Sequence, residues 1–234
     1  MLHSDKFGRP KDDLPRMSEA IKLEARFARV LDAFGAEQRA AAERERVLKQ
    51  AVGWATRVLE WNQRIDLTAA RSHDELVDLL MADAAAIVHV AGDRLRGDWV
   101  DIGSGAGGPG LGLALLSPAI SITLVEPKAK RVAFLRSVVG ELSCPNVRVQ
   151  RARSDELAVG AFDSAVSRAT FAPAEWLVEG ARLSRSLVWV LLAQGEAPPA
   201  LKFRQVADHK YEWPLTGVER RVVLYAHQPN DAPD

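Results

Sequence analysis

The residues best placed to do chemistry lie in a glycine-rich segment that follows a short apolar run ending at Asp101. Three glycines follow this acid at the spacing Gly-x-Gly-x-x-Gly, with a proline directly after them: Gly103, Gly105, Gly108 and Pro109. Glycine permits positive φ angles and close approach of the backbone to a ligand, and proline suits the first position of a helix. Because a helix N-terminus presents free backbone N–H groups, the segment predicts a nucleotide-cofactor loop between a strand and a helix.

Two acidic residues at successive strand ends distinguish between the possible cofactors. Asp101 precedes the first glycine by two residues, and Glu126 follows the next apolar run, 23 residues after Gly103. A carboxylate at Glu126 can accept hydrogen bonds from the ribose hydroxyls of NAD or of S-adenosylmethionine. A carboxylate at Asp101 would repel a pyrophosphate but attract the ammonium and sulfonium groups of S-adenosylmethionine. The residues therefore favour S-adenosylmethionine, and the alternative is an NAD(P)-dependent dehydrogenase.

Strand and helix patterns alternate from Trp99 onwards and must position this loop. Such alternation is typical of a parallel sheet covered by helices on both faces. Two final strand patterns, at 203–211 and 219–227, flank a turn with Pro214 and Gly217 and predict an antiparallel hairpin. The pattern predicts an α/β fold with a doubly wound, mostly parallel seven-stranded sheet, as in the Rossmann-like class I methyltransferases. The other predicted strands lie near residues 98–102, 120–125, 146–150, 162–167 and 186–193, and the helices between them near 109–117, 128–140 and 173–184.

The first 95 or so residues are expected to form a helical extension. Apolar residues recur at helical spacing over about 17–34 and 36–61, and Ser72 with Glu75 forms a capping-box pattern for a third helix that Gly92 ends. Residues 1–16 are polar and are expected to form a loose tail. We therefore expect a tail and helical extension at 1–95 and an S-adenosylmethionine-binding methyltransferase domain at 96–234.

Composition narrows the function classes. The formal net charge is zero, which argues against a generally basic coat for nucleic acid. No apolar run approaches the length of a membrane span, and the N-terminus lacks the apolar core of a secretion signal. Cys144 is the single cysteine, which fits a reducing cytoplasm, and the five histidines lack metal-ligand spacing. We therefore expect a cytoplasmic protein without membrane or metal partners.

Charge is distributed unevenly along the chain, although the formal net charge is zero. Residues 128–153 contain seven basic residues and one acidic residue. Lys128, Lys130 and Arg131 begin this stretch, directly after Glu126. The stretch is interpreted in two ways, as a solvated helix face or as a patch that faces phosphates beside the cofactor cleft.

Several segments resemble, in the right order, the motifs of the bacterial 16S rRNA guanine-N7 methyltransferases, also called glucose-inhibited division protein B. They span roughly residues 55–195. The glycine loop is common to many methyltransferases, whereas the first and last segments are much more specific. The matching segments are WNQRIDLTA at 61–69 with Arg71, DIGSGAG at 101–107, PG at 109–110, KRVAFL at 130–135, RSDE at 153–156, FD at 162–163 and VSRA at 166–169.

The resemblance implies an enzyme that methylates ribosomal RNA or the small ribosomal subunit, with a helical cap over its cofactor. It implies S-adenosylmethionine contacts at Gly103, Gly108, Ser154, Asp155 and Arg168. Guanine N7 carries a lone pair and no proton, so methyl transfer to it needs positioning and charge but no general base.

Arg168 is the candidate catalytic residue, because it follows the fourth predicted strand, where ligands gather in open α/β sheets. It is expected to orient the cofactor or to brace a phosphate of the target nucleotide. The alternative is a surface ion pair with Asp163 or Asp155. Phe171 and Trp176 are candidates for stacking on a looped-out base, and the alternative for Trp176 is packing under a helix.

Four positions depart from the family pattern: Leu80 replaces a usual histidine, Ala84 a serine, Gln194 a lysine and Gly108 a larger apolar residue. These departures keep two alternatives open. One is a diverged methyltransferase that acts on another RNA or on a small molecule. The other is a noncatalytic module that binds RNA or the ribosome.

Overall fold

Seven strands form one sheet in the computed structural model, which describes residues 13–35, 39–200 and 202–228. The first five strands along the chain run parallel, and the last two form an antiparallel hairpin at one edge. The strands are β1 (Gly97–Ile102), β2 (Ile120–Val125), β3 (Val147–Gln150), β4 (Phe162–Ser167), β5 (Ser184–Leu192), β6 (Phe203–Glu212) and β7 (Glu219–His227). Their order across the sheet is β3-β2-β1-β4-β5-β7-β6. The predicted doubly wound, mostly parallel sheet is confirmed, and each predicted strand ends within about two residues of an observed end.

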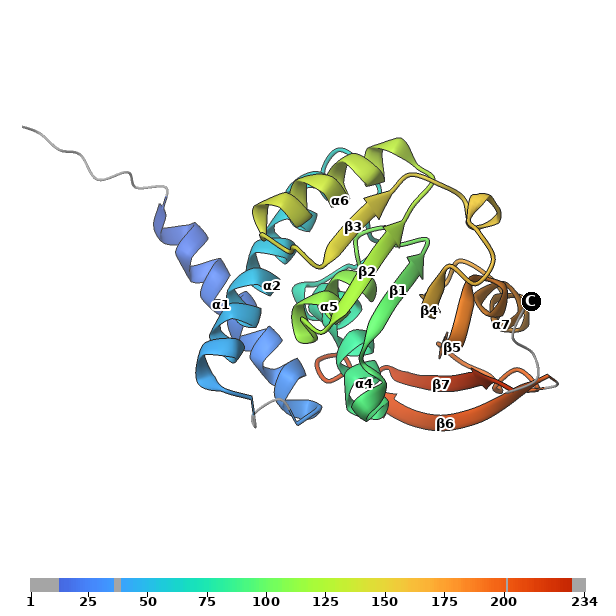
Figure 1. Ribbon diagram of the computed structural model, residues 1–234. Coiled ribbons are helices and arrows are strands. Elements are labelled where there is room, and N and C mark those ends of the chain that lie inside the picture. Colours follow the sequence, from blue (N-terminus) through green and yellow to red (C-terminus); the bar gives the residue numbers. More distant parts are fainter. Residues whose placement is uncertain (1–12, 36–38, 201, 229–234) are drawn as a thin grey trace, which may run out of the picture.

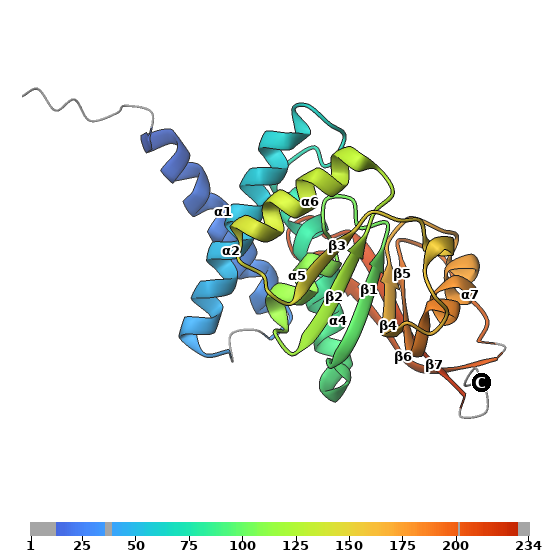
Figure 2. The same ribbon diagram turned by 45° about the horizontal axis from the view of Figure 1, so that its top comes forward.

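Helices cover both faces of this sheet (Figure 1). The helices are α1 (Asp13–Ala33), α2 (Ala41–Asn62), α3 (His73–Val77), α4 (Asp83–Ala91), α5 (Gly110–Leu116), α6 (Ala129–Glu141) and α7 (Pro173–Leu183). Helices α4, α5 and α6 lie on one face with α1 and α2 outside them, and α7 lies on the other face (Figure 2). Right-handed crossovers between parallel strands account for this division.

Alternation along the strands builds a separate apolar cluster on each face. Trp99 and Val166 pack with the helices of the larger layer, whereas Val100 and Ala165 pack with α7. Trp99 stacks on Trp189 of β5 with ring centroids 5.7 Å apart. Because β1, β2, β4 and β5 run parallel, their carboxyl ends meet at one edge of the sheet.

The helical extension differs in detail from the expectation. Residues 1–12 and 36–38 lie outside the described residues, but α1 already begins at Asp13, so a loose tail through residue 16 is wrong. Gly35 has a φ of +79° after α1, and Gly92 a φ of +53° after α4. Leu23 and Trp54 of the extension belong to the same apolar cluster as Trp99 of the sheet. A domain boundary between residues 95 and 96 stays a prediction.

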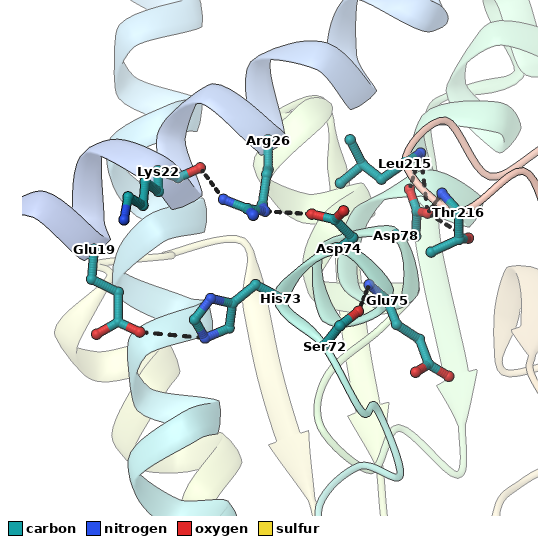
Figure 3. Close-up of polar contacts among 10 residues, drawn as sticks. All are labelled: Glu19, Lys22, Arg26, Ser72, His73, Asp74, Glu75, Asp78, Leu215 and Thr216. Atoms are coloured by element: carbon teal, nitrogen blue, oxygen red, sulfur yellow. Dashed lines mark hydrogen bonds and ion pairs between the residues drawn. The ribbon is translucent and has the colours of Figure 1, made fainter.

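The third predicted helix contains a π-helical turn over Asp78–Ala82, which separates α3 from α4. Ser72 caps α3 as predicted, since its hydroxyl accepts the N–H of Glu75 at 3.1 Å (Figure 3). The Glu75 carboxylate accepts the N–H of Arg71 at 2.8 Å instead of that of Ser72, so the capping box is only half formed. Among the described residues no helix is both long and apolar enough to cross a membrane.

Candidate functional site

The glycine loop turns between β1 and α5 and is tied to the end of β2. The N–H of Gly103 donates to the carbonyl of Val125 at 2.9 Å. One oxygen of the buried Glu126 carboxylate accepts the N–H of Gly105 at 3.1 Å, and its other oxygen accepts the N–H of Lys128 at 3.0 Å. The structure thus brings Gly105 and Glu126 together, with the carboxylate serving the loop itself.

Asp101 lies beneath this loop, with only 1% of its surface exposed. One carboxylate oxygen accepts the N–H of Gly110 at 3.1 Å, at the start of α5. A Cβ at Gly110 would lie 2.6 Å from that oxygen, so glycine is required for this approach. The other oxygen, Oδ1, is buried without a hydrogen-bond partner in the described part of the chain. Burial raises the pKa of Asp101 to about 7, against the opposing effects of the Gly110 hydrogen bond and of the Arg168 charge.

A cavity of about 790 Å³ opens beside the loop, at the carboxyl ends of the parallel strands. Gly103, Ser154 and Asp155 line it, whereas Asp101, Gly105, Gly108, Glu126 and Arg168 do not. Its size suits a small-molecule ligand. The remaining lining residues are Ile102, Val125, Pro127, Ala152, Arg153, Thr170, Phe171, Glu175, Val178 and Glu179.

Three carboxylates and one guanidinium line this cavity: Asp155, Glu175, Glu179 and Arg153. Asp155 pairs with Arg153, and Glu179 pairs with Arg182 of α7 at 2.8 Å, so Glu175 is the lining carboxylate without an ion pair in the described part of the chain. The Arg182 hydrogen bonds lower the pKa of Glu179. A cation is therefore better accommodated here than an anion.

Two walls of the cavity are fixed by contacts that the sequence pattern did not reveal. A Cβ at Gly103 would collide with the Thr170 side chain after β4, and Gly103 has a φ of +76°. Arg182 of α7 donates to the carbonyl of Ser154 at 2.7 Å, which anchors the segment after β3. The Asp155 side chain is 70% exposed and pairs with Arg153 at 3.5 Å.

Arg168 points away from the cavity, toward the helical layer. Its guanidinium donates to the carbonyl of Leu79 in the π-helical turn and to the carboxylate of Asp83 at 3.0 Å. The other oxygen of Asp83, which is 2% exposed, accepts the Tyr211 hydroxyl at 2.7 Å and the Trp213 indole N–H at 2.8 Å. Burial beside Asp83 raises the pKa of Tyr211. This network joins β4, α4 and the β6–β7 hairpin.

The alternative interpretation of Arg168, a surface pair with Asp163 or Asp155, is wrong. Asp163 instead pairs with Arg185 at 2.8 Å, and Asp155 pairs with Arg153. Asp83, the true partner, lies 85 residues before Arg168, and no local pattern links the two residues.

Gly108 belongs to the same side of the loop as Arg168. A Cβ at Gly108 would lie 2.9 Å from the Leu79 carbonyl oxygen and 3.2 Å from Arg168 Nη2. Only a residue without a side chain lets the loop approach the π-helical turn this closely. Gly108 therefore packs between the loop and the helical layer.

The structure also places the residues that depart from the family pattern and the two candidates for base stacking. Leu80 and Ala84 lie in the apolar core, and Gln194 is exposed after β5 in a second cavity of about 470 Å³.

Base stacking by Trp176 is wrong, because this residue is 3% exposed and its indole N–H donates to the carbonyl of Trp189 at 2.8 Å. Phe171 stacks on Trp176 and lines the larger cavity. Within the described residues, no group of three or more His, Cys, Asp or Glu is arranged to hold a metal ion.

Comparisons with known proteins place the chain in a family. The family model described as GidB, rRNA small subunit methyltransferase G, matches residues 47–228. Ribosomal RNA small subunit methyltransferase G of Chromohalobacter salexigens is 38% identical over 165 residues, which cover 69% of this chain and 74% of the relative. The protein of the same name from Halorhodospira halophila is 35% identical over 172 residues, covering 74% and 77% of the two chains.

A solved SAM-dependent methyltransferase from Aquifex aeolicus has a TM-score of 0.47 and 16% identity, covering 65% of this chain and 92% of its own. The family model spans the glycine loop, the cavity and the Arg168–Asp83 pair together. The chain belongs to the GidB family, the rRNA small subunit methyltransferase G family.

Proposed function

We propose that this protein transfers a methyl group from S-adenosylmethionine to N7 of a guanine in 16S ribosomal RNA, in the cytoplasm where small subunits are assembled. The observation that carries the proposal is the acidic cavity beside the glycine loop, within the part of the chain that matches the family model. S-adenosylmethionine supplies an electrophilic methyl group when it is bound.

The residues of the cavity fit such a positively charged donor. Gly103, Ser154 and Asp155 would contact it, and Glu175, which has no ion pair in the described residues, adds negative charge to the same wall. The surplus of carboxylates favours a sulfonium and an ammonium over a pyrophosphate. This balance supports a methyl donor and argues against NAD(P).

Residues outside the cavity would act on the cofactor indirectly. Glu126 holds the loop through the N–H groups of Gly105 and Lys128, which its two carboxylate oxygens accept. Asp101 lies buried under the loop, and above its pKa of about 7 it places a negative charge there, on a carboxylate with one oxygen that has no hydrogen-bond partner among the described residues. We propose that both residues shape the cofactor loop.

Arg168 would face the nucleic acid, while Gly108 lets the glycine loop pack beside its guanidinium. Asp83 and the Leu79 carbonyl hold the Arg168 guanidinium at the carboxyl end of β4, where it can brace a phosphate of the target nucleotide. Guanine N7 has no proton to lose, so the residues here need only orient the base and exclude water. No general base is assigned.

The test is methylation by the purified protein with isotopically labelled S-adenosylmethionine. Assembled small subunits, protein-free 16S rRNA and a panel of small metabolites are offered in parallel, and the labelled nucleotide is located by mass spectrometry. We expect label in a guanine of the subunit or the RNA. Label in metabolites alone would instead indicate a diverged methyltransferase. Ribosome binding without calorimetric binding of S-adenosylhomocysteine would indicate a noncatalytic module.

A further inference from the structure

A third cavity, lined mostly by polar residues, lies next to the cofactor cavity along the chain, since Pro127 lines the cofactor cavity and Lys128 lines this one. It has a volume of about 510 Å³ and lies between the start of α6 and residues 62–66, the segment that follows α2. Its charged lining residues are four cations and one acid: Arg64, Lys128, Lys130, Arg131 and Asp66. We call it the basic cavity.

Hydrogen bonds hold the segment after α2 against α6. The Arg131 guanidinium donates twice to the backbone carbonyl of Asp66, at 3.1 and 2.8 Å. The Asn62 side-chain oxygen accepts the N–H groups of Leu67 and Thr68 at 2.9 and 3.0 Å. The Asn62 contacts are local, but the Arg131 contacts join segments 65 residues apart, so the basic cavity is built by the tertiary fold.

The cations of the basic cavity are not neutralised within the described residues. Arg131 is bonded to a carbonyl and not to a carboxylate, and none of the four forms an ion pair there. Arg64, Lys128 and Lys130 are exposed. Four like charges beside one acid make this surface strongly attractive to an anion.

The first turn of α6 adds to this attraction. The intrahelical hydrogen bonds of α6 begin where the N–H of Val132 donates to the carbonyl of Lys128. The N–H groups that precede Val132 in the helix therefore lack intrahelical acceptors. The helix has 13 residues, and its dipole places partial positive charge at this end. The helix dipole and the basic side chains thus both favour a negatively charged ligand.

The basic cavity adjoins the cofactor cavity. Pro127 lines the cofactor cavity and Lys128 lines the basic one, and the N–H of Lys128 is bonded to Glu126. The two cavities have opposite charge, acidic for the first and basic for the second. A polyanion that reaches the methyl donor can therefore place a neighbouring phosphate in the basic cavity.

We propose that the basic cavity binds a backbone phosphate of the RNA substrate, near the nucleotide that is methylated. This inference rests on the proposed function. The exposed, flexible lysines suit a phosphodiester of a polymer, whose binding is driven largely by release of counterions. The charge of the basic cavity would thus dock the RNA, while the acidic cavity holds the donor.

The test compares two double variants of the full chain. Arg64→Gln/Lys130→Gln removes two cations from the basic cavity, and Arg29→Gln/Lys49→Gln removes one arginine and one lysine from exposed positions of α1 and α2. The KM for small subunits, the salt dependence of RNA binding and the calorimetric affinity for S-adenosylhomocysteine are measured for each. For the cavity variant we expect a KM raised about tenfold and a salt slope lower in magnitude by about one to two. Its affinity for S-adenosylhomocysteine should equal that of the wild type.

Two results would overturn the inference while leaving the proposed function intact. One is a cavity variant whose KM and salt slope match those of the control variant, in a wild type that methylates subunits. The other result combines two observations: inorganic phosphate at constant ionic strength inhibits the wild type but not the cavity variant, and the cavity variant keeps the wild-type KM for subunits. This result would assign the basic cavity to a free anion. A wild type that methylates no RNA contradicts the proposed function itself.

Discussion

Asp101 shows how a residue can influence a ligand from beneath the surface that the ligand touches. Its position two residues before Gly103 suggested direct attraction of a cationic cofactor, but its carboxylate lies under the loop and accepts the N–H of Gly110. Burial makes the charged form of Asp101 unfavourable, which a nearby cation would partly offset. The charge of Asp101 therefore affects both the stability of the loop and the electrostatic potential around the loop.

The first prediction concerns the pH dependence of Asp101. Its pKa is about 7 in the folded protein and 3.8 in a model peptide, so the native state holds the proton more tightly. Ionisation of Asp101 therefore lowers the free energy of unfolding as pH rises from about 4 through 7. The difference in unfolding free energy, Asp101→Asn minus wild type, should increase over this range by roughly 2 to 4 kcal/mol. Denaturant titrations at several pH values measure it, and the exposed Asp155→Asn serves as the control; a difference independent of pH contradicts the buried ionisation.

Arg168 provides a second prediction at the residue scale. Arg168→Met leaves the buried Asp83 carboxylate without its cation and should cost about 3 kcal/mol of stability. It should also lower the rate of methylation, since the guanidinium is proposed to face the RNA. Arg185→Met breaks the exposed pair with Asp163 and should cost less than about 1 kcal/mol. Equal costs in thermal or denaturant unfolding would show that the Arg168 pair is not a buried one.

At the scale of elements, the π-helical turn connects the helical layer to the β6–β7 hairpin. The fully buried Asp78 carboxylate accepts the N–H of Leu215 at 3.2 Å and both the N–H and the hydroxyl of Thr216, at 2.9 and 2.8 Å (Figure 3). Burial raises the pKa of Asp78, and these hydrogen bonds oppose that effect. Asp78 and Asp83 thus hold the hairpin and Arg168 from either end of the turn.

Loss of the Asp78 carboxylate should loosen the hairpin turn. Asp78→Ala leaves the N–H groups of Leu215 and Thr216 without their acceptor, at a cost of about 2 kcal/mol. We expect faster amide hydrogen exchange over residues 213–218 and unchanged exchange in β1. Asp74→Ala is the control, because Asp74 lies one turn before Asp78 and forms a half-exposed pair with Arg26 of α1 (Figure 3). Unaltered protection of the hairpin in Asp78→Ala would refute this connection.

At the scale of the whole molecule, the helical extension and the sheet share one apolar core. Trp54 of α2 is buried, and its indole N–H donates to the carbonyl of Ala106 in the glycine loop at 2.8 Å. A Cβ at Gly107 would lie 3.0 Å from the same indole ring. The extension therefore supports the loop directly.

Removal of the extension tests this shared core. We expect residues 96–234 alone to lack a cooperative unfolding transition, because the apolar side chains of the larger cluster that pack on α2 and α4 would be exposed to water. The full chain should unfold in one transition, with coincident near- and far-ultraviolet circular dichroism curves. Two separated transitions, or a stably folded fragment, would support the domain boundary predicted between residues 95 and 96.

The sequence by itself determined the doubly wound sheet, the glycine loop after β1 and the family motifs, because these depend on local periodicity and on residues close together in the chain. The tertiary structure alone decided that Asp101 lies under the loop, that Trp176 is buried and that Arg168 pairs with Asp83. It also built the basic cavity from two segments about 65 residues apart. Burial and charge pairing depend on which segments pack together, and hydrophobic periodicity specifies which face of each element is buried but not the partner it meets.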